Sequence, residues 1–169
     1  MSTGELVTRW TIRLALALYV VALGSLLAGR PHLTRQARRA WTAGCVLLLL
    51  HVLAAFHFFH HWRHAEAYRD TARQTAELLG VEFGGGLWFN YAFAACWTLD
   101  ALWWWSAGMD RYRLRSAWIT WSVHLFMAFI ALNATVVFET GPTCWLSLAA
   151  VIVLVAIWLR QTPAGSSGR

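Results

Sequence analysis

The sequence predicts an all-α protein, a polytopic transmembrane helical bundle of five spans. Of its 169 residues, 59% are hydrophobic and only 13% are charged, whereas a soluble domain has about 25% charged residues. Apolar runs recur along the chain with lengths near the roughly 20 residues that a helix needs to cross a bilayer. Tryptophans stand at or near the ends of these runs, which is typical of membrane–water interfaces.

We expect the spans at residues 10–29, 41–62, 87–105, 117–138 and 144–159, in one bundle that occupies residues 1–160. Arg9 and Arg13 before the first run also fit the start of a signal peptide, whose cleavage would leave four spans. Of the tryptophans, only Trp97 lies mid-span, whereas the others fall at or near an end: Trp10, Trp41, Trp62, Trp88, Trp103, Trp104, Trp105, Trp118, Trp121, Trp145 and Trp158. The tail 161–169 is rich in Gly and Ser and is expected to be disordered.

Between the second and third spans, the pattern predicts an amphipathic helix outside the membrane, over residues 64–79. Small and apolar residues recur there at helical spacing: Ala65, Tyr68, Ala72, Ala76 and Leu79. Gly80 suits a helix C-cap, and a glycine run at 84–86 then turns the chain into the third span. We expect the second span to continue directly into this helix.

The arginines predict the orientation. All fourteen basic residues are arginines, and nine of them belong to one side: Arg30, Arg35, Arg38, Arg39, Arg111, Arg113, Arg115, Arg160 and Arg169. The positive-inside rule makes this side cytoplasmic and places the N-terminus outside and the C-terminus inside. We therefore expect a multi-pass protein of a bacterial inner membrane, with the lipid bilayer as its main partner. The arginines form no single stripe, which argues against nucleic acid.

Several functional classes are excluded by the residues that the chain lacks. Without lysine it cannot form a Schiff base with retinal or pyridoxal phosphate. Its three cysteines, Cys45, Cys96 and Cys144, form no CxxC pair, so a disulfide framework or a thiolate metal site is not expected. No serine stands in a G-x-S-x-G setting that would indicate a hydrolase. The sequence thus favours a protein without enzymatic activity.

A cluster of four histidines is the most unusual motif: His57, His60, His61 and His64. On a continuous helix they would share an arc of roughly 100° at the outer end of the second span, and their i,i+4 pairs could bind one metal ion. Imidazole suits Zn, Cu or Fe. Further ligands on the same side would be Glu66, Glu82, Asn90 and Glu139. The alternative is that the four rings are interfacial anchors that bind headgroups, water or carbonyls.

The motif His57-x-x-His60-His61 resembles one histidine box of the membrane fatty-acid desaturase and hydroxylase family. That resemblance covers five residues and implies a di-iron centre held by several such boxes. The other histidines, His32, His51 and His124, are isolated, so the chain has no second box.

A second set of polar residues lies within the spans. Asp100 in the third span and His124 in the fourth would sit at similar depth, and pairing would satisfy both. Such a pair is either a packing contact or part of a proton path that His51 could join. His51 and His124 could instead be the axial ligands of a single haem b.

These residues leave three classes of function open. The first is a membrane protein whose outer histidines bind a transition metal. The second is a non-catalytic accessory subunit or a homo-oligomer, in which small residues such as Ala128 and Ala131 allow close helix packing. The third is a haem b protein or a small proton-coupled carrier that uses Asp100, His124 and His51.

Overall fold

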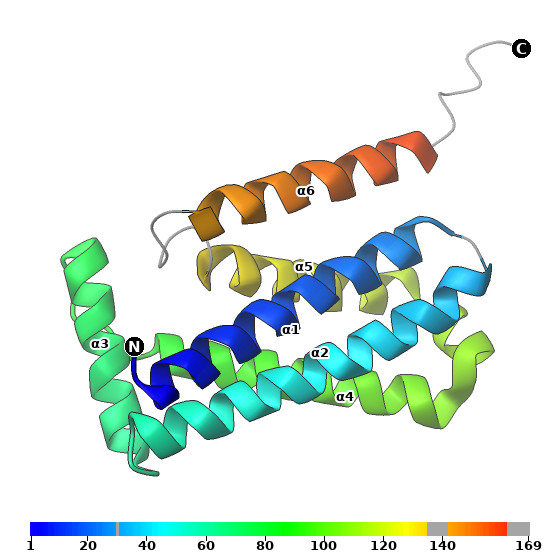
Figure 1. Cartoon of the computed structure of the whole chain (residues 1–169). Coiled ribbons are helices and arrows are strands. Elements are labelled where there is room, and N and C mark those ends of the chain that lie inside the picture. Colours follow the sequence, from blue (N-terminus) through cyan, green and yellow to red (C-terminus); the bar gives the residue numbers. More distant parts are fainter. Residues whose placement is uncertain (30, 135–141, 162–169) are drawn as a thin grey trace, which may run out of the picture.

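A computed structural model describes residues 1–29, 31–134 and 142–161, and within these ranges the chain forms six helices and no strand. The helices are α1 (Thr3–Leu27), α2 (Pro31–Phe58), α3 (His64–Leu79), α4 (Gly86–Arg113), α5 (Ala117–Leu132) and α6 (Pro142–Gln161) (Figure 1). The prediction of an all-α chain is confirmed. The expected end of the fourth span at 135–138, Glu139 and the tail at 162–169 lie outside the described residues.

α1 and α2 form an antiparallel pair that organises the bundle (Figure 1). α1 begins at Thr3, earlier than its apolar run, because Ser2 caps it: the Ser2 hydroxyl accepts the Glu5 N–H at 3.2 Å, and the Glu5 carboxylate accepts the Ser2 N–H at 2.9 Å. α2 likewise begins before its apolar run and includes Arg35, Arg38 and Arg39 of the predicted first connection. In the described part of the chain, two helical stretches are long and apolar enough to cross a bilayer, Thr3–Leu27 and Leu33–Phe58.

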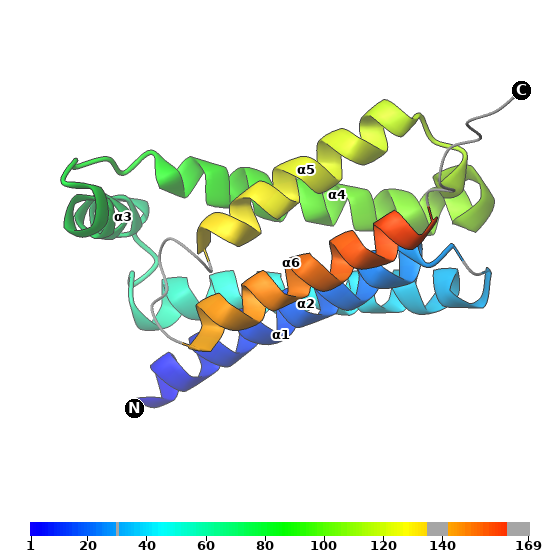
Figure 2. The ribbon, with the colours of Figure 1, turned by 90° about the horizontal axis from the view of Figure 1, so that it is seen from above.

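The remaining helices pack around this pair. α6 lies against α1, α4 lies against α2, and α5 packs on α4, as the view from above shows (Figure 2). α3 occupies the range of the expected amphipathic helix and runs across one end of the bundle, where it contacts α4 (Figures 1 and 2). The start of α1 and the end of α6 lie at opposite ends of the bundle (Figure 1).

The core is aromatic. Tyr19 of α1, Trp41 of α2 and Trp97 of α4 lie in mutual contact, with ring centroids 5.3–5.6 Å apart. The Trp97 indole N–H donates to the Trp41 carbonyl at 3.1 Å, which satisfies a buried donor. Gly44 makes room for this ring, since a Cβ at that position would lie 2.8 Å from the Trp97 ring.

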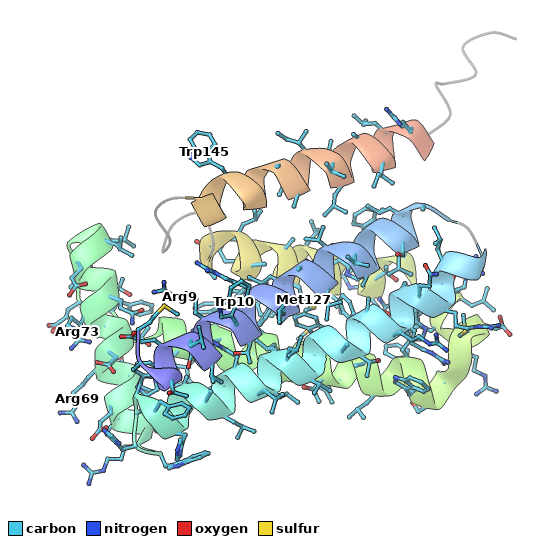
Figure 3. All side chains as sticks on the ribbon, in the orientation of Figure 1. Arg9, Trp10, Arg69, Arg73, Met127 and Trp145 are labelled. Carbon is cyan, nitrogen blue, oxygen red and sulfur yellow. The ribbon has the colours of Figure 1, made fainter. Side chains whose placement is uncertain are left out.

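Two tryptophans near the predicted span ends lie inside the bundle. Trp41 and Trp104 are completely buried among other helices. Their position at a membrane interface stays a prediction, because burial between helices does not determine depth in a bilayer. Trp145 behaves differently: it is 73% exposed and points away from α6, whereas Met127 lies inside the bundle (Figure 3).

Candidate functional site

The four clustered histidines lie where α2 ends and α3 begins, at residues 57–64, which we call the histidine turn. α2 ends at Phe58, so that His60 and His61 stand in the connection and His64 begins α3. His61 and Trp62 have φ of 47° and 60°, a conformation that residues with a Cβ seldom adopt. The prediction that the histidines share one face of a continuous helix is wrong, because the helix stops before His60.

His60 faces the first turns of α3. Its Nδ1 lies 3.2 Å from the Asp70 carboxylate, at an angle that makes no hydrogen bond. Asp70 also pairs with Arg73 at 2.9 Å. Arg73 is mostly exposed and points away from the bundle (Figure 3). His60 therefore contacts a carboxylate that already has a cationic partner.

The other histidines of the turn have separate surroundings. His64 shares a 3.0 Å hydrogen bond with the Tyr91 hydroxyl of α4, and its ring lies 5.3 Å from that of Trp88. His57 is exposed and contacts the Trp62 ring. The imidazoles of His57, His60 and His64 thus face different neighbours instead of converging on one point.

The further metal ligands expected from the sequence do not join them. Glu66 pairs with Arg63 at 3.2 Å, while Glu82 and Asn90 are exposed. Glu139 lies outside the described residues. Over residues 1–29, 31–134 and 142–161, no three His, Cys, Asp or Glu side chains gather as a metal site would require. Binding of Zn, Cu or Fe by the histidine turn stays a prediction from the sequence.

His51 belongs to the contact between α1 and α2. Its Nδ1 lies 2.9 Å from the Thr8 carbonyl oxygen. A carbonyl only accepts, so Nδ1 carries the proton. His124 instead lies against Trp41, with ring centroids 5.4 Å apart. Since Trp41 precedes His51 by ten residues, about 15 Å of helix rise separates the two histidine positions. This geometry does not fit two axial ligands of one haem b, nor a direct proton path between them.

Asp100 has partners that the sequence did not predict. Its Oδ2 accepts the Tyr112 hydroxyl at 2.7 Å, and its Oδ1 pairs with Nη1 of Arg115. The Arg115 and Asp100 side chains are only 2% and 3% exposed. These three residues, which we call the Arg115 cluster, take the place of the expected direct Asp100–His124 pair. A buried ion pair of this kind needs such additional hydrogen bonds to offset its desolvation.

Gly108 is the position that brings the cluster together. Although α4 runs to Arg113, its backbone leaves helical geometry at Gly108, with φ 80° and ψ 172°. This region of conformation is accessible essentially to glycine alone. The break redirects the chain so that Tyr112 stacks on Trp104, with centroids 4.1 Å apart and planes 3° from parallel, and reaches Asp100.

Arg115 and Tyr112 are held tightly. Arg115 Nε donates to the Thr120 hydroxyl at 2.9 Å, and the guanidinium lies over the Tyr112 ring at 4.1 Å. The Tyr112 phenol donates to the Asp100 carboxylate, which accepts from Arg115 on its other oxygen.

Two polar atoms near the cluster are buried without a hydrogen-bond partner in the described structure: Nη2 of Arg115 and Nδ1 of His124. Buried polar groups are nearly always paired, and leaving one unpaired costs about 1–3 kcal/mol. Both residues line the same cavity. The two nitrogens themselves have almost no accessible surface, so other atoms of these two residues form the cavity wall.

The cavity has a volume of about 560 Å³ and lies between α1, α5, α6 and the end of α4. Its polar wall comes from the α4–α5 junction and α5: Tyr112, Arg113, Arg115, Thr120 and His124. Its remaining walls are mainly apolar and include Leu23, Leu26, Leu27, Leu125, Leu154 and Val155. Ala128, expected to pack helices closely, lines this cavity as well. Small-molecule sites have this size and this mixture of mostly apolar and few polar groups.

The sequence did not single out Arg115 and Tyr112. Arg115 counted only as one of the arginines that set the orientation, and Tyr112 attracted no attention. One signal could have narrowed the search: a carboxylate inside an apolar span needs a partner, and Arg115 is one of three arginines that follow Gly108, a glycine that can redirect the chain.

Comparisons with protein family models, with curated proteins and with solved structures found no match to this chain. The case for a function therefore depends on the geometry of the chain itself.

Proposed function

We propose that the chain is an integral membrane protein with five spans, α1, α2, α4, α5 and α6. α1 and α2 have the length and apolarity that a span requires. The outer faces of the bundle expose large apolar side chains, as a lipid-facing surface does. They include Leu14 and Val21 on α1, Val46 and Leu53 on α2, Leu99 and Leu102 on α4, Leu125 and Phe129 on α5, and Ile152 and Val153 on α6.

In the proposed orientation the N-terminus is outside and the C-terminus is cytoplasmic. An odd number of spans agrees with the start of α1 and the end of α6 lying at opposite ends of the bundle (Figure 1). α3 then lies along the outer surface, with Arg69 and Arg73 pointing away from the bundle (Figure 3). The arginine-rich ends of α4 and α6 face the cytoplasm, in agreement with the positive-inside rule.

Within this bundle, the proposed function is to bind an amphiphilic molecule, with its polar head at the Arg115 cluster and its apolar part against the walls of α1, α5 and α6. The observation that carries this proposal is that one cavity joins a polar wall with two arginines, Arg113 and Arg115, to mainly apolar walls from α1, α5 and α6. The polar wall suits the head of such a molecule, and the apolar walls give the remainder of the ligand an apolar environment.

Native mass spectrometry of the purified protein tests this function. The protein released from detergent should carry one bound amphiphile. Ala128→Trp places a large ring in the cavity and should remove that adduct. Ser122→Trp is the matched control, since Ser122 is an exposed residue of the same helix that does not line the cavity. Equal adducts in the wild type and in both variants, or no adduct in the wild type, would refute the proposal.

A further inference from the structure

We infer that anionic phospholipids bind at the end of the bundle where α2 begins and where α4 and α6 end (Figures 1 and 2). Exposed arginines of the described chain occupy this end, and we call them the arginine rim: Arg35, Arg39, Arg111, Arg113 and Arg160. The inference rests on the proposed membrane bundle and goes beyond the proposed cavity function, because it assigns a partner to an outer surface. In the proposed orientation this partner belongs to the inner leaflet.

The charge of the arginine rim is not offset by the protein. Among the described residues at this end, Asp110 is the one exposed acid, so five arginines and one aspartate leave a net charge of about +4. None of the rim arginines pairs with a carboxylate in the part of the chain that the structure describes. The buried Asp100 already has Arg115 as its partner. A surface of this charge attracts anions from its surroundings.

The opposite end of the bundle provides acidic partners for its arginines. Arg73 of α3 pairs with Asp70 at 2.9 Å, and Arg63 pairs with Glu66 at 3.2 Å. Such exposed pairs contribute little to stability, but they place an acid beside each of these two arginines. Because the arginine rim has no such pairs among the described residues, an external anion can take the place of the missing acids there.

Apolar side chains beside the arginine rim favour a lipid as the source of that anion. Leu114 and Trp118 follow the rim arginines of α4 and are 84% and 78% exposed. Trp105 is 53% exposed, and its indole N–H donates to the Thr42 hydroxyl at 2.9 Å. Exposed tryptophans at the end of a span are typical of the headgroup region of a bilayer. A soluble polyanion would leave these side chains in water, whereas a phospholipid covers them with its chains and brings its phosphate to the arginines.

The net charge of the lipid should decide its affinity for the rim. Phosphatidylglycerol is a net anion, whereas choline offsets the phosphate charge in phosphatidylcholine. Each arginine near a membrane surface strengthens the attraction of anionic lipid by about fivefold in affinity. Two rim arginines beside one phosphate would therefore favour phosphatidylglycerol about tenfold or more.

Native mass spectrometry of the full-length protein in a neutral detergent tests this partner. The protein is mixed with equal amounts of phosphatidylglycerol and phosphatidylcholine that have the same acyl chains, at low ionic strength, where salt screens surface charges little. We expect phosphatidylglycerol adducts to exceed phosphatidylcholine adducts about tenfold or more. Equal adducts of the two lipids would overturn the inference.

Variants at the two ends of the bundle locate the binding surface. Arg35→Gln/Arg39→Gln removes two rim charges that do not line the cavity and should reduce the phosphatidylglycerol excess about fivefold or more. Arg111→Gln tests the rim independently on α4 and should also reduce the excess. Arg9→Gln/Arg69→Gln is the matched control, since both arginines are exposed at the opposite end, and it should leave the excess unchanged. Unfolding curves establish that the variants fold. Equal losses in the rim and control variants would overturn the assignment to this end.

Further measurements separate the alternatives. Glycerol phosphate supplies the anion without chains, and adducts as abundant as those of phosphatidylglycerol would overturn the lipid in favour of a soluble anion. Ala128→Trp should leave the phosphatidylglycerol excess unchanged, and its loss would place the lipid in the cavity and overturn the surface site. A co-purified amphiphile that persists in Ala128→Trp would refute the cavity function alone. Release of the protein from cell membranes by alkaline carbonate would refute the membrane bundle on which both depend.

Discussion

The histidine turn and the Arg115 cluster lie at opposite ends of the bundle. Their polar side chains differ in burial and in whether they contact one another. In the histidine turn, the rings are mostly exposed, and His57, His60 and His64 each contact a different neighbour. In the Arg115 cluster, residues up to 15 positions apart converge on one carboxylate in a buried setting. The histidines, which are close together in the sequence, therefore do not form one site. The three residues of the Arg115 cluster, which are further apart in the sequence, do. Burial decides the energy of a polar group, and closeness in the sequence does not.

The largest expected effect comes from breaking the buried ion pair. Arg115→Gln leaves the Asp100 carboxylate buried beside a neutral group and should destabilise the protein by about 4 kcal/mol. Thermal unfolding in detergent, followed by circular dichroism, measures this change. The double variant Asp100→Asn/Arg115→Gln removes both charges together and should lose much less. If the single and the double variant were equally unstable, the ion pair would not be the source of the effect.

The break in α4 ranks second. Gly108→Ala forces a Cβ into a conformation reserved for glycine, and since no atom lies within 4 Å of that Cβ, the cost is purely conformational, about 2 kcal/mol. Gly80 is the matched control at the C-cap of α3, where φ is 73° and space is equally open. Gly80→Ala should cost about 1 kcal/mol. Gly80→Asn should be nearly neutral, but Gly108→Asn should not, and similar values for both asparagine variants would contradict this account.

A pair of tyrosines compares the two regions directly. Tyr112→Phe removes a buried donor to Asp100 and should cost about 1.5 kcal/mol. Tyr91→Phe removes the exposed contact with His64 and should cost about 0.3 kcal/mol, since water replaces it. The apparent unfolding temperatures of the two variants give this contrast. A larger loss in Tyr91→Phe would reverse the ranking of the two regions.

The smallest effect is expected in the histidine turn itself. His60→Asn should cost about 0.5 kcal/mol, because its contact with Asp70 is partly exposed and Asp70 retains Arg73. Unfolding curves with and without added zinc provide the measurement. A zinc-dependent stabilisation that His57→Asn/His61→Asn abolishes would establish the metal site predicted from the sequence and would make this end of the bundle the functional one.

The sequence was most informative where one local rule determines the structure. Helical periodicity placed α3, and Gly80 marked its end. Apolar runs located the other helices. α1 and α2 begin earlier than their apolar runs, because an apolar run indicates the part of a helix that is suited to lipid, whereas the hydrogen-bonded helix can be longer. The prediction that α2 continues into α3 was wrong, because α2 ends before His60 and no glycine or proline in the sequence indicates a turn there.

The residues of the site were less predictable, because the partners of Asp100 are determined by tertiary structure. Asp100 was correctly singled out as a buried carboxylate, but several groups could have paired with it. His124 was the candidate at similar depth in the membrane. The backbone break at Gly108 makes Tyr112 and Arg115 the partners instead. His124 still takes part, as a wall of the cavity. Such a choice depends on the path of the backbone, which residue spacing alone does not reveal.

During synthesis, Asp100 is made before its partner Arg115. Arg115 follows Asp100 by 15 residues, a delay of about one to three seconds at cellular rates of synthesis. In the proposed topology, the segment that carries Asp100 therefore reaches the translocon before its countercharge exists. A carboxylate in mid-span costs about 3 kcal/mol at insertion, so this segment should enter the bilayer late, or with Asp100 protonated, until Arg115 emerges and the chain folds back at Gly108.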